Sequence, residues 1–175
     1  MTTSIKLSSR SWTTLRRDLL GSNVEEVAIA YSEFRSGPHN EFAVRTIELM
    51  AESDFERRSE FHVTLTDDAL ARVIKRAWDL KLSIVELHSH LDTATACFSP
   101  SDIAGLRDLV PHVWWRLRGA PYAAIVVTSA EIDGLAWTAS AEQPEPIDEL
   151  VAGKTIVRPS GRSFQRLEDS HDRAF

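Results

Sequence analysis

The sequence predicts one domain of mixed α/β or α+β class. Segments with apolar residues at helical spacing, two of which open on hydroxyl caps, alternate with segments rich in β-branched and aromatic residues. The chain has 175 residues, of which 43% are hydrophobic and 26% are charged. A chain of this length and composition can bury a core of its own, which excludes a disordered or fibrous protein.

In the first half of the chain, helices are expected to alternate with strand pairs. Residues 11–20 place their apolar side chains on one stripe, and Gly21 can end this helix. Thr66 is followed by two acids, which is typical of a helix start, and helical spacing continues to about Leu80. Strands are expected over residues 4–8, 24–34, 42–50 and 60–65, with a turn at residues 36–40.

The second half of the chain continues this alternation. Residues 83–91 switch to a period of two, which predicts a strand, and residues 99–102 open another helix. Two more strands are expected over residues 122–129 and 135–139, joined by a turn at Asp133-Gly134. The domain is taken to span residues 1–157, and the polar residues 158–175 are expected to form a tail.

Composition excludes several kinds of function. The net charge of -6 argues against nucleic acid as a partner, because phosphate binding needs a basic field. No apolar run approaches the ~18 residues of a membrane span, and the start of the chain lacks a secretion signal, so we expect a cytoplasmic protein without a membrane partner. Cys97 is the single cysteine, which rules out multi-cysteine zinc sites. Trp114-Trp115 is expected to pack one ring and expose the other, with an interaction surface as the alternative.

The segment that carries chemistry is the run from Val85 to His90, followed by residues 99–102. His88 and His90 project from the same side of a strand, and Asp102 stands in the first turn of the next helix. Two imidazoles and a carboxylate are three ligands that zinc accepts, and three protein ligands leave one position open for water, as in catalytic sites. Zinc would lower the pKa of that water toward ~7. The alternative is that residues 99–102 only cap the helix.

This run resembles the signature of the JAMM (MPN-plus) metalloproteases, in which a distant glutamate precedes His-x-His and Ser-x-x-Asp. The resemblance implies a JAMM/MPN-like fold, a cytidine-deaminase-like mixed sheet flanked by helices. It also implies that His88, His90 and Asp102 bind Zn²⁺, and that Ser99 helps to hold the catalytic water and the oxyanion. The spacer at residues 91–98 is one residue longer than is usual in the family.

The distant glutamate of the family is matched by Glu26, which would be the general base. It stands in Glu26-Val27-Ala28-Ile29, where the family has a Glu-Val-x-Gly-like context and Ile29 replaces the glycine. The neighbouring Glu25 is the rival, since alternation along a strand places the two carboxylates on opposite faces. Glu86 shares a face with the histidines and is expected to support a ligand or to form a salt bridge.

The resemblance implies a zinc-dependent (iso)peptidase that cleaves after the C-terminal glycine end of a ubiquitin-like protein. The reaction would serve deconjugation or precursor processing, including in bacterial conjugation and antiviral systems. The implied partners are a ubiquitin-like protein or its conjugate, together with activating-like and conjugating-like enzymes. The alternative is a metal-free MPN-type scaffold or binding module within a protein complex.

Overall fold

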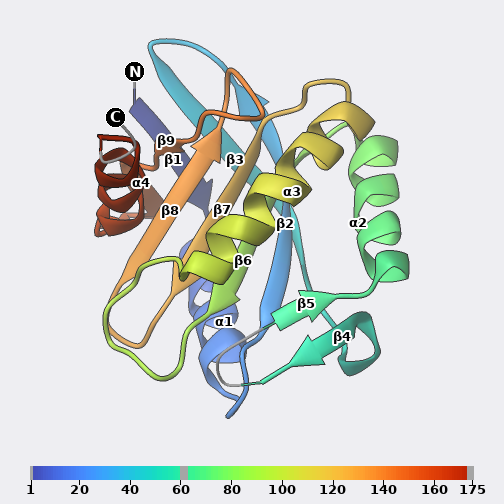
Figure 1. Cartoon of the computed structure of the whole chain (residues 1–175), viewed down its shortest axis with the longest axis vertical. Helices are drawn as coiled ribbons and strands as arrows, with labels where there is room; N and C mark the ends of the chain where they lie inside the picture. Colours follow the sequence, from blue (N-terminus) through green and yellow to red (C-terminus); the bar gives the residue numbers. More distant parts are fainter. Residues whose placement is uncertain (1, 60–62, 173–175) are drawn as a thin grey trace.

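The computed structural model describes residues 2–59 and 63–172, which form a large mixed sheet with helices on both faces (Figure 1). The helices are α1 (Ser9–Leu20), α2 (Asp67–Leu80), α3 (Pro100–Arg116) and α4 (Arg162–Asp172). The large sheet contains β1 (Thr2–Leu7), β2 (Val27–Arg35), β3 (His39–Leu49), β6 (Ser83–Ser89), β7 (Tyr122–Val127), β8 (Ile132–Trp137), β9 (Glu145–Pro146), β10 (Glu149–Ala152) and β11 (Thr155–Val157). A smaller sheet pairs β4 (Phe55–Arg58) with β5 (Val63–Leu65).

The strand order of the large sheet is β11-β10-β1-β3-β2-β6-β7-β8-β9. The pairs β1–β10, β1–β3 and β6–β7 are parallel and the others are antiparallel, so the expected mixed α/β class is confirmed. The strand β6, which carries the first of the paired histidines, lies in the interior of the sheet between β2 and β7. No helix in residues 2–59 and 63–172 is long and apolar enough to cross a membrane.

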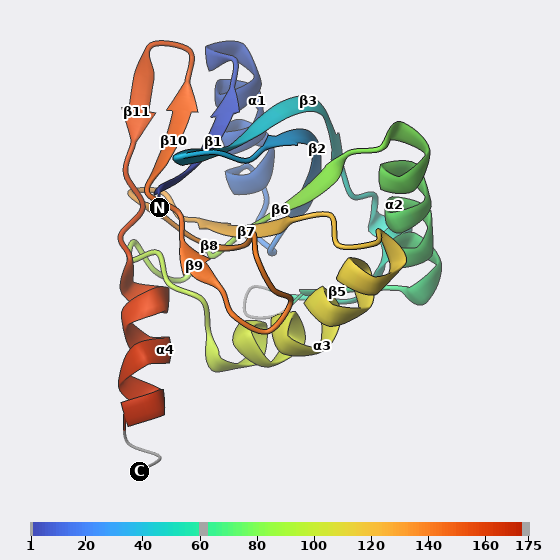
Figure 2. The same cartoon turned by 90° about the horizontal axis from the view of Figure 1, so that it is seen from above.

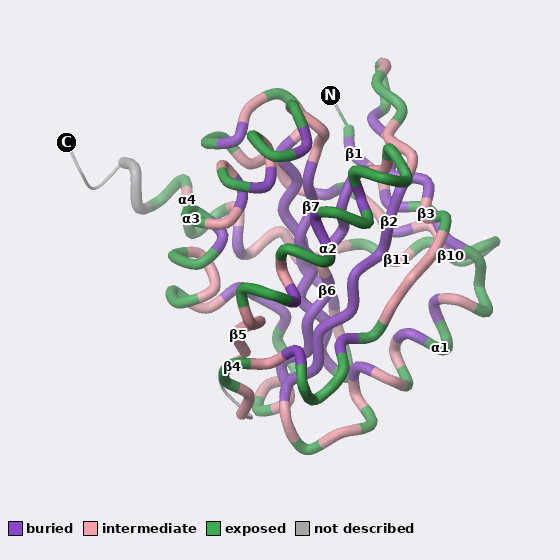
Figure 3. Tube along the Cα trace, turned by 90° about the vertical axis from the view of Figure 1, so that its right-hand side faces the viewer, coloured by how far each residue is buried: buried purple, intermediate pink, exposed green. Residues whose placement is uncertain are grey.

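Helices cover the sheet unequally on its two faces. The first helix α1 lies on one face, and α2 and α3 lie on the other (Figure 2). A hydrophobic core lies on each face of the sheet, and alternate residues of β2 pack into one or the other. Val27 and Ile29 pack on the α2–α3 side, and Ala28 and Ala30 pack on the α1 side. The central strands are therefore buried along most of their length, while the helices keep exposed outer faces (Figure 3).

The predicted helix starts follow from local capping. The hydroxyl of Thr66 accepts from the backbone N–H of Ala69 and begins α2. The hydroxyl of Ser99 accepts from the N–H of Asp102, whose carboxylate accepts from the N–H of Ser99, and Pro100 occupies the first helical position. This reciprocal capping box fixes the start of α3.

The expected turn at Asp133-Gly134 is wrong, because both residues lie within β8. The chain turns instead at residues 128–131. The Asp133 carboxylate accepts from the N–H groups of Gly161 and Ser163, a long-range role that local turn statistics do not reveal. At Gly134 a Cβ would lie 2.7 Å from the side chain of Ile147, so this glycine allows close packing and not a turn.

The polar segment that was expected to be a tail contains α4. Ser163 is buried, and Phe164 and Leu167 pack against the core on the α2–α3 side of the sheet. The short strands β4, β9, β10 and β11 were also not predicted. The strand expected over residues 60–65 is seen as β5, and residues 60–62 lie outside the described part of the chain.

Candidate metal centre

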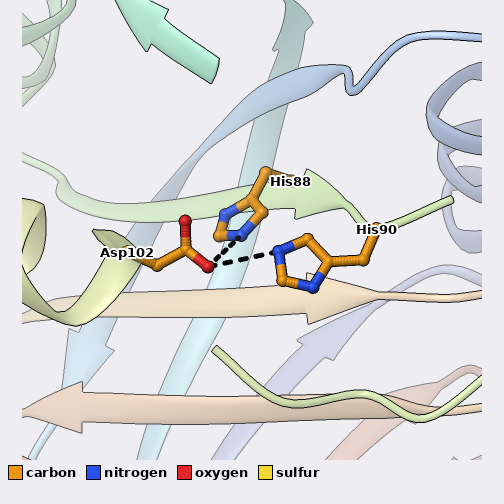
Figure 4. Close-up of side chains that lie close together, drawn as sticks. All are labelled: His88, His90 and Asp102. Atoms are coloured by element: carbon orange, nitrogen blue, oxygen red, sulfur yellow. Dashed lines mark ion pairs between the residues drawn. The ribbon is translucent and has the colours of Figure 1, made fainter. Parts of the chain in front are cut away.

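The residues His88, His90 and Asp102 converge in the folded chain, as the sequence predicted (Figure 4). His88 lies near the end of β6, His90 directly follows this strand, and Asp102 comes from the first turn of α3. Oδ2 of Asp102 lies 3.2 Å from Nε2 of His90 and 3.7 Å from Nε2 of His88. One ligand atom from each residue lies within 4.8 Å of the others, so the three could hold one metal ion.

The donor atoms of this group fit a transition-metal cation. Both ring nitrogens of His88 are buried, and neither has a hydrogen-bond partner among the described residues. A buried imidazole without partners loses the hydrogen bonds that water would provide, and a cation would restore an interaction for its lone pair. Two imidazoles and one carboxylate are also a donor set that divalent transition metals favour.

Electrostatics in the group keep Asp102 ionised. Burial would raise the pKa of Asp102, but the two imidazoles and Ser99 hold this pKa well below its ordinary value. Burial would lower the pKa of His88, but Asp102 and Glu86 outweigh it and raise the pKa to about 10. A cation must therefore displace a proton from His88, because a metal ligand needs a neutral ring.

Ser99 lies beside the group, with its hydroxyl engaged in the start of α3. Its Oγ accepts from the N–H of Asp102 at 3.1 Å and lies 2.8 Å from Oγ of Ser101. Residues 99–102 therefore cap the helix, which confirms that expectation. The same capping is compatible with Asp102 as a metal ligand. The same Oδ2 atom of Asp102 accepts from the N–H of Ser99 at 2.7 Å, which orients the carboxylate toward the histidines.

The structure brings Glu25, and not Glu26, to this group. The carboxylate of Glu25 lies 3.8 Å from Nε2 of His90, and the residue is 2% exposed. The carboxylate of Glu26 instead pairs with Arg58 of β4, and its backbone N–H donates to Oγ of Ser89 at 2.9 Å. The expected position of Glu26 at the site is therefore corrected in favour of its neighbour.

The register between β2 and β6 explains this correction. Val27 lies directly opposite His88 in the antiparallel pair, so both side chains are on the α3 side of the sheet. Glu25 has the same parity as Val27, whereas Glu26 has the parity of Ala28, which packs toward α1. Adjacent glutamates thus face opposite sides, and only one faces the histidines.

The sequence pattern offers a partial match to each of the two glutamates. The family context places a glycine three positions after the glutamate, and the residue three positions after Glu25 is Ala28, the smallest replacement. Taking Glu26 puts the bulky Ile29 at that position. Taking Glu25, however, puts Glu26 at the position where that pattern has valine, so the pattern does not choose between the two glutamates.

The environment of Glu25 favours its protonated form more than water does. Burial raises the pKa of Glu25, and the carboxylates of Asp102 and Asp92 raise it further, while His90 and His88 act in the opposite direction. The backbone of Glu25 is held by hydrogen bonds on both sides of its Cα atom. Its N–H donates to the carbonyl of Ser59 at 2.8 Å, and its own carbonyl accepts from Arg58 at 3.0 Å.

Glu86 lies beside the candidate ligand His88, on the face of the strand that the sequence predicted. Its Oε1 lies 3.6 Å from Nδ1 of His88, on the opposite side of the ring from the nitrogen that faces Asp102. The hydroxyl of the buried Tyr122 donates to the other oxygen of Glu86. Carboxylates in this position fix the orientation of a ligating imidazole. Asp92 is exposed in the loop after β6, as expected for a loop residue.

Side chains from other parts of the chain form hydrogen bonds with the backbone of the loop between the histidines and α3. Its backbone at Ala94 accepts from Thr128, its N–H at Ala96 donates to Glu131, and its N–H at Phe98 donates to Ser163 of α4. Sequence reasoning did not find these supports. Cys97 in the same loop is buried, and its Sγ lies 3.6 Å from Oγ of Ser163, which fits the packing role expected for it.

A groove of about 240 Å³ leads to the group between β5 and α3. Gly105 of α3 lines it, and no heavy atom lies within 4 Å of the position that a Cβ would take there, so this part of the wall is open. Apolar residues dominate the lining, which consists of Val27, Val63, Thr64, Leu65, Leu70, Glu86, His88, Ser101, Asp102, Gly105, Leu106 and Leu109.

No protein-family model matches this chain, and no curated protein matches it either. The chemistry of the site therefore follows from its own residues. Three candidate ligands and a neighbouring carboxylate converge, and two of the ligands, His88 and Asp102, line the groove. This arrangement can hold a cation and place a proton acceptor beside it, which is what metal-assisted hydrolysis requires.

Proposed function

We propose that the protein is a zinc-dependent hydrolase of JAMM type that cleaves an amide bond. The observation that supports this proposal most strongly is the convergence of His88, His90 and Asp102 with the buried Glu25 beside them. The order of His-x-His strand, loop and capped helix agrees with the JAMM signature. The expected substrate is a ubiquitin-like protein, cut after its C-terminal glycine end.

His88, His90 and Asp102 would hold zinc in this proposal. When bound by three protein ligands, zinc has an open coordination position for water, lowers the pKa of that water to ~7 and polarises a carbonyl group. Glu86 would keep the ring of His88 in its ligating orientation. The capping box would do the same for Asp102.

Glu25 would act as the general base and then as the general acid. Its carboxylate lies beside His90, so it can take a proton from the attacking water and deliver it to the leaving amine. Ser99 would donate its hydroxyl proton to the oxyanion while its oxygen still caps α3. Glu26 would have a structural role through its pair with Arg58.

The groove suits an extended chain with small residues near the cut. It is mostly apolar, and β5 forms one wall, against which an extended peptide could align. Glycine has no Cβ, so a Gly-Gly end would bring its backbone close to His88 and Asp102 where a larger residue would clash. This reasoning selects a ubiquitin-like tail over a bulky peptide.

A metal-free scaffold remains the second candidate, and one observation favours it. His90 and Asp102 lie 3.2 Å apart, so the group can be held together by ion pairs without a cation. The ring nitrogens of His88, which have no hydrogen-bond partner among the described residues, favour the metal instead. Metal content separates the two functions directly.

The test combines elemental analysis with a cleavage assay. We expect zinc near one equivalent in the purified protein, lost in His88→Ala and Asp102→Ala and kept in the control His112→Ala, an exposed histidine outside the group. Fusions of ubiquitin-like proteins should be cut after the terminal glycine pair, as mapped by mass spectrometry. A chelator should stop the reaction and thiol alkylation should not.

Full zinc content in both ligand variants would exclude the proposed centre. Cleavage that survives zinc removal but stops when Cys97 is alkylated would replace the metal mechanism with a thiol mechanism. Bound zinc without cleavage of any fusion would keep the metal centre and favour a binding role.

A further inference from the structure

A second groove lies between the C-terminal ends of α2 and α3, which are adjacent in both Figure 1 and Figure 2. Its volume is about 570 Å³, and we call it the tryptophan surface. Trp115 is 72% exposed and Trp78 is 46% exposed, although large aromatic residues are normally buried. The surface is made by Lys75, Trp78, His112, Trp115, Arg116 and Arg118.

A guanidinium group lies over each of the two exposed indole rings. The Cζ atom of Arg116 lies 5.3 Å from the ring centre of Trp115, and that of Arg118 lies 4.9 Å from the ring centre of Trp78. Neither arginine forms an ion pair with any residue in the described part of the chain. Stacking engages the face of a guanidinium and leaves the N–H groups on its edge to bind a carboxylate.

The local charge of this surface is opposite to that of the whole protein. Lys75, Arg116 and Arg118 contribute three positive charges, and Asp79, which pairs with Lys75, contributes one negative charge. The complete chain carries a net charge of -6. A positive patch on an acidic protein selects partners of negative charge.

We propose that the tryptophan surface binds an acidic segment of a partner protein. Tryptophan and arginine are the residues that most often supply binding energy at protein interfaces, and here they are combined in one groove. Carboxylates of the segment would pair with Arg116 and Arg118, and its apolar side chains would cover the indoles of Trp78 and Trp115.

This surface is separate from the candidate metal centre. Asp102 lies in the first turn of α3 and Arg116 is its last residue, so the two are roughly 20 Å apart along the helix axis. The proposal therefore does not depend on zinc or on amide cleavage. It gives the protein a docking site for a partner that need not enter the groove at β5.

The test measures binding of a short labelled peptide rich in aspartate and glutamate with interspersed leucines. We expect saturable binding that weakens with added salt, and a loss of roughly tenfold or more in affinity for Trp115→Ala and for Arg116→Glu. The matched control is Arg10→Glu, which makes the same charge change on exposed α1, on the other face of the sheet. Asp102→Ala should bind like the wild type.

Several results would overturn the proposal. One is the absence of binding at low salt, and another is an equal loss in Arg10→Glu, which would indicate attraction without a defined site. Equal binding of a peptide with lysine in place of the acids would exclude charge recognition. Preferred binding of single-stranded oligothymidylate, lost in Trp115→Ala, would assign the surface to nucleic acid instead. Circular dichroism of each variant checks the fold, and the exposure of Trp115 makes its replacement safe.

Discussion

Replacing either of the two adjacent glutamates by glutamine should separate catalysis from stability. We expect Glu25→Gln to lose turnover and keep the fold, because its carboxylate faces His90 and pairs with no arginine in the described part of the chain. We expect Glu26→Gln to keep most turnover and lose stability, because its carboxylate pairs with Arg58 in a nearly buried position. The two substitutions are chemically identical and one residue apart.

The magnitudes follow from the two environments. A general base contributes roughly 10²–10⁴-fold, so Glu25→Gln should raise the activation free energy by about 3–5 kcal/mol. Burial raises the pKa of Glu25, so its ionised form is costly in the folded state and the neutral amide should leave stability at pH 7 unchanged or higher. The side chains of Glu26 and Arg58 are 11% and 12% exposed, and breaking such a pair costs up to about 3–5 kcal/mol. Because Arg58 keeps Glu52 as a partner, we expect about 1–3 kcal/mol for Glu26→Gln.

Two measurements on the same zinc-loaded samples test this prediction. Urea unfolding gives the free energy of unfolding, and cleavage of a ubiquitin-like fusion gives kcat/KM. Loss of turnover in Glu26→Gln with retained turnover in Glu25→Gln would return the base to the position expected from the sequence. A stability loss of equal size in both variants would refute the reasoning about the Arg58 pair.

Three further predictions concern the metal ligands and the groove. Glu86→Gln should weaken zinc binding roughly 10–100-fold in a chelator competition, because Glu86 orients His88, and unchanged affinity would exclude that role. The pKa of His88, about 10, keeps its ring charged before binding, so zinc uptake near pH 7 should release a proton and zinc affinity should rise with pH. Calorimetric heats of zinc binding that are equal in buffers of different ionisation enthalpy would contradict this. Gly105→Ala should stabilise α3 by about 0.5–1 kcal/mol and leave cleavage intact, whereas Gly105→Phe should narrow the groove and lower kcat/KM at full zinc content; identical kinetics in the two variants would show that substrate does not pass there.

The parts of the fold that the sequence predicted are those with local causes. The start of α2 follows from the Thr66 cap and the start of α3 from Ser99, and both caps act within one helical turn. The strands β9, β10 and β11 are short, and β10 joins the large sheet by pairing with a strand from the start of the chain. In β10, for example, Glu149 lies opposite Ser4 of β1 in a parallel pair. No local pattern encodes such a partner.

The candidate site was predictable to the same extent. His88 and His90 face one side of β6 by simple alternation, and Asp102 is fixed by its capping box, so their convergence could be read from spacing. Alternation also separates Glu25 from Glu26, but it does not say which face of β2 meets the histidines. That depends on the pairing of Val27 with His88 across two strands far apart in the sequence.

The spacer before α3 shows how a long loop can still place Asp102 beside the histidines. A loop of eight residues at positions 91–98 would by itself let the start of α3 move. Asp133 of β8 accepts from the N–H groups of Gly161 and Ser163, and this fixes the first turn of α4 against the sheet. Ser163 in turn accepts from the N–H of Phe98, the residue before Ser99. The polar C-terminal segment thus holds the loop at the point where the capping box begins, and the position of Asp102 depends on residues beyond 157.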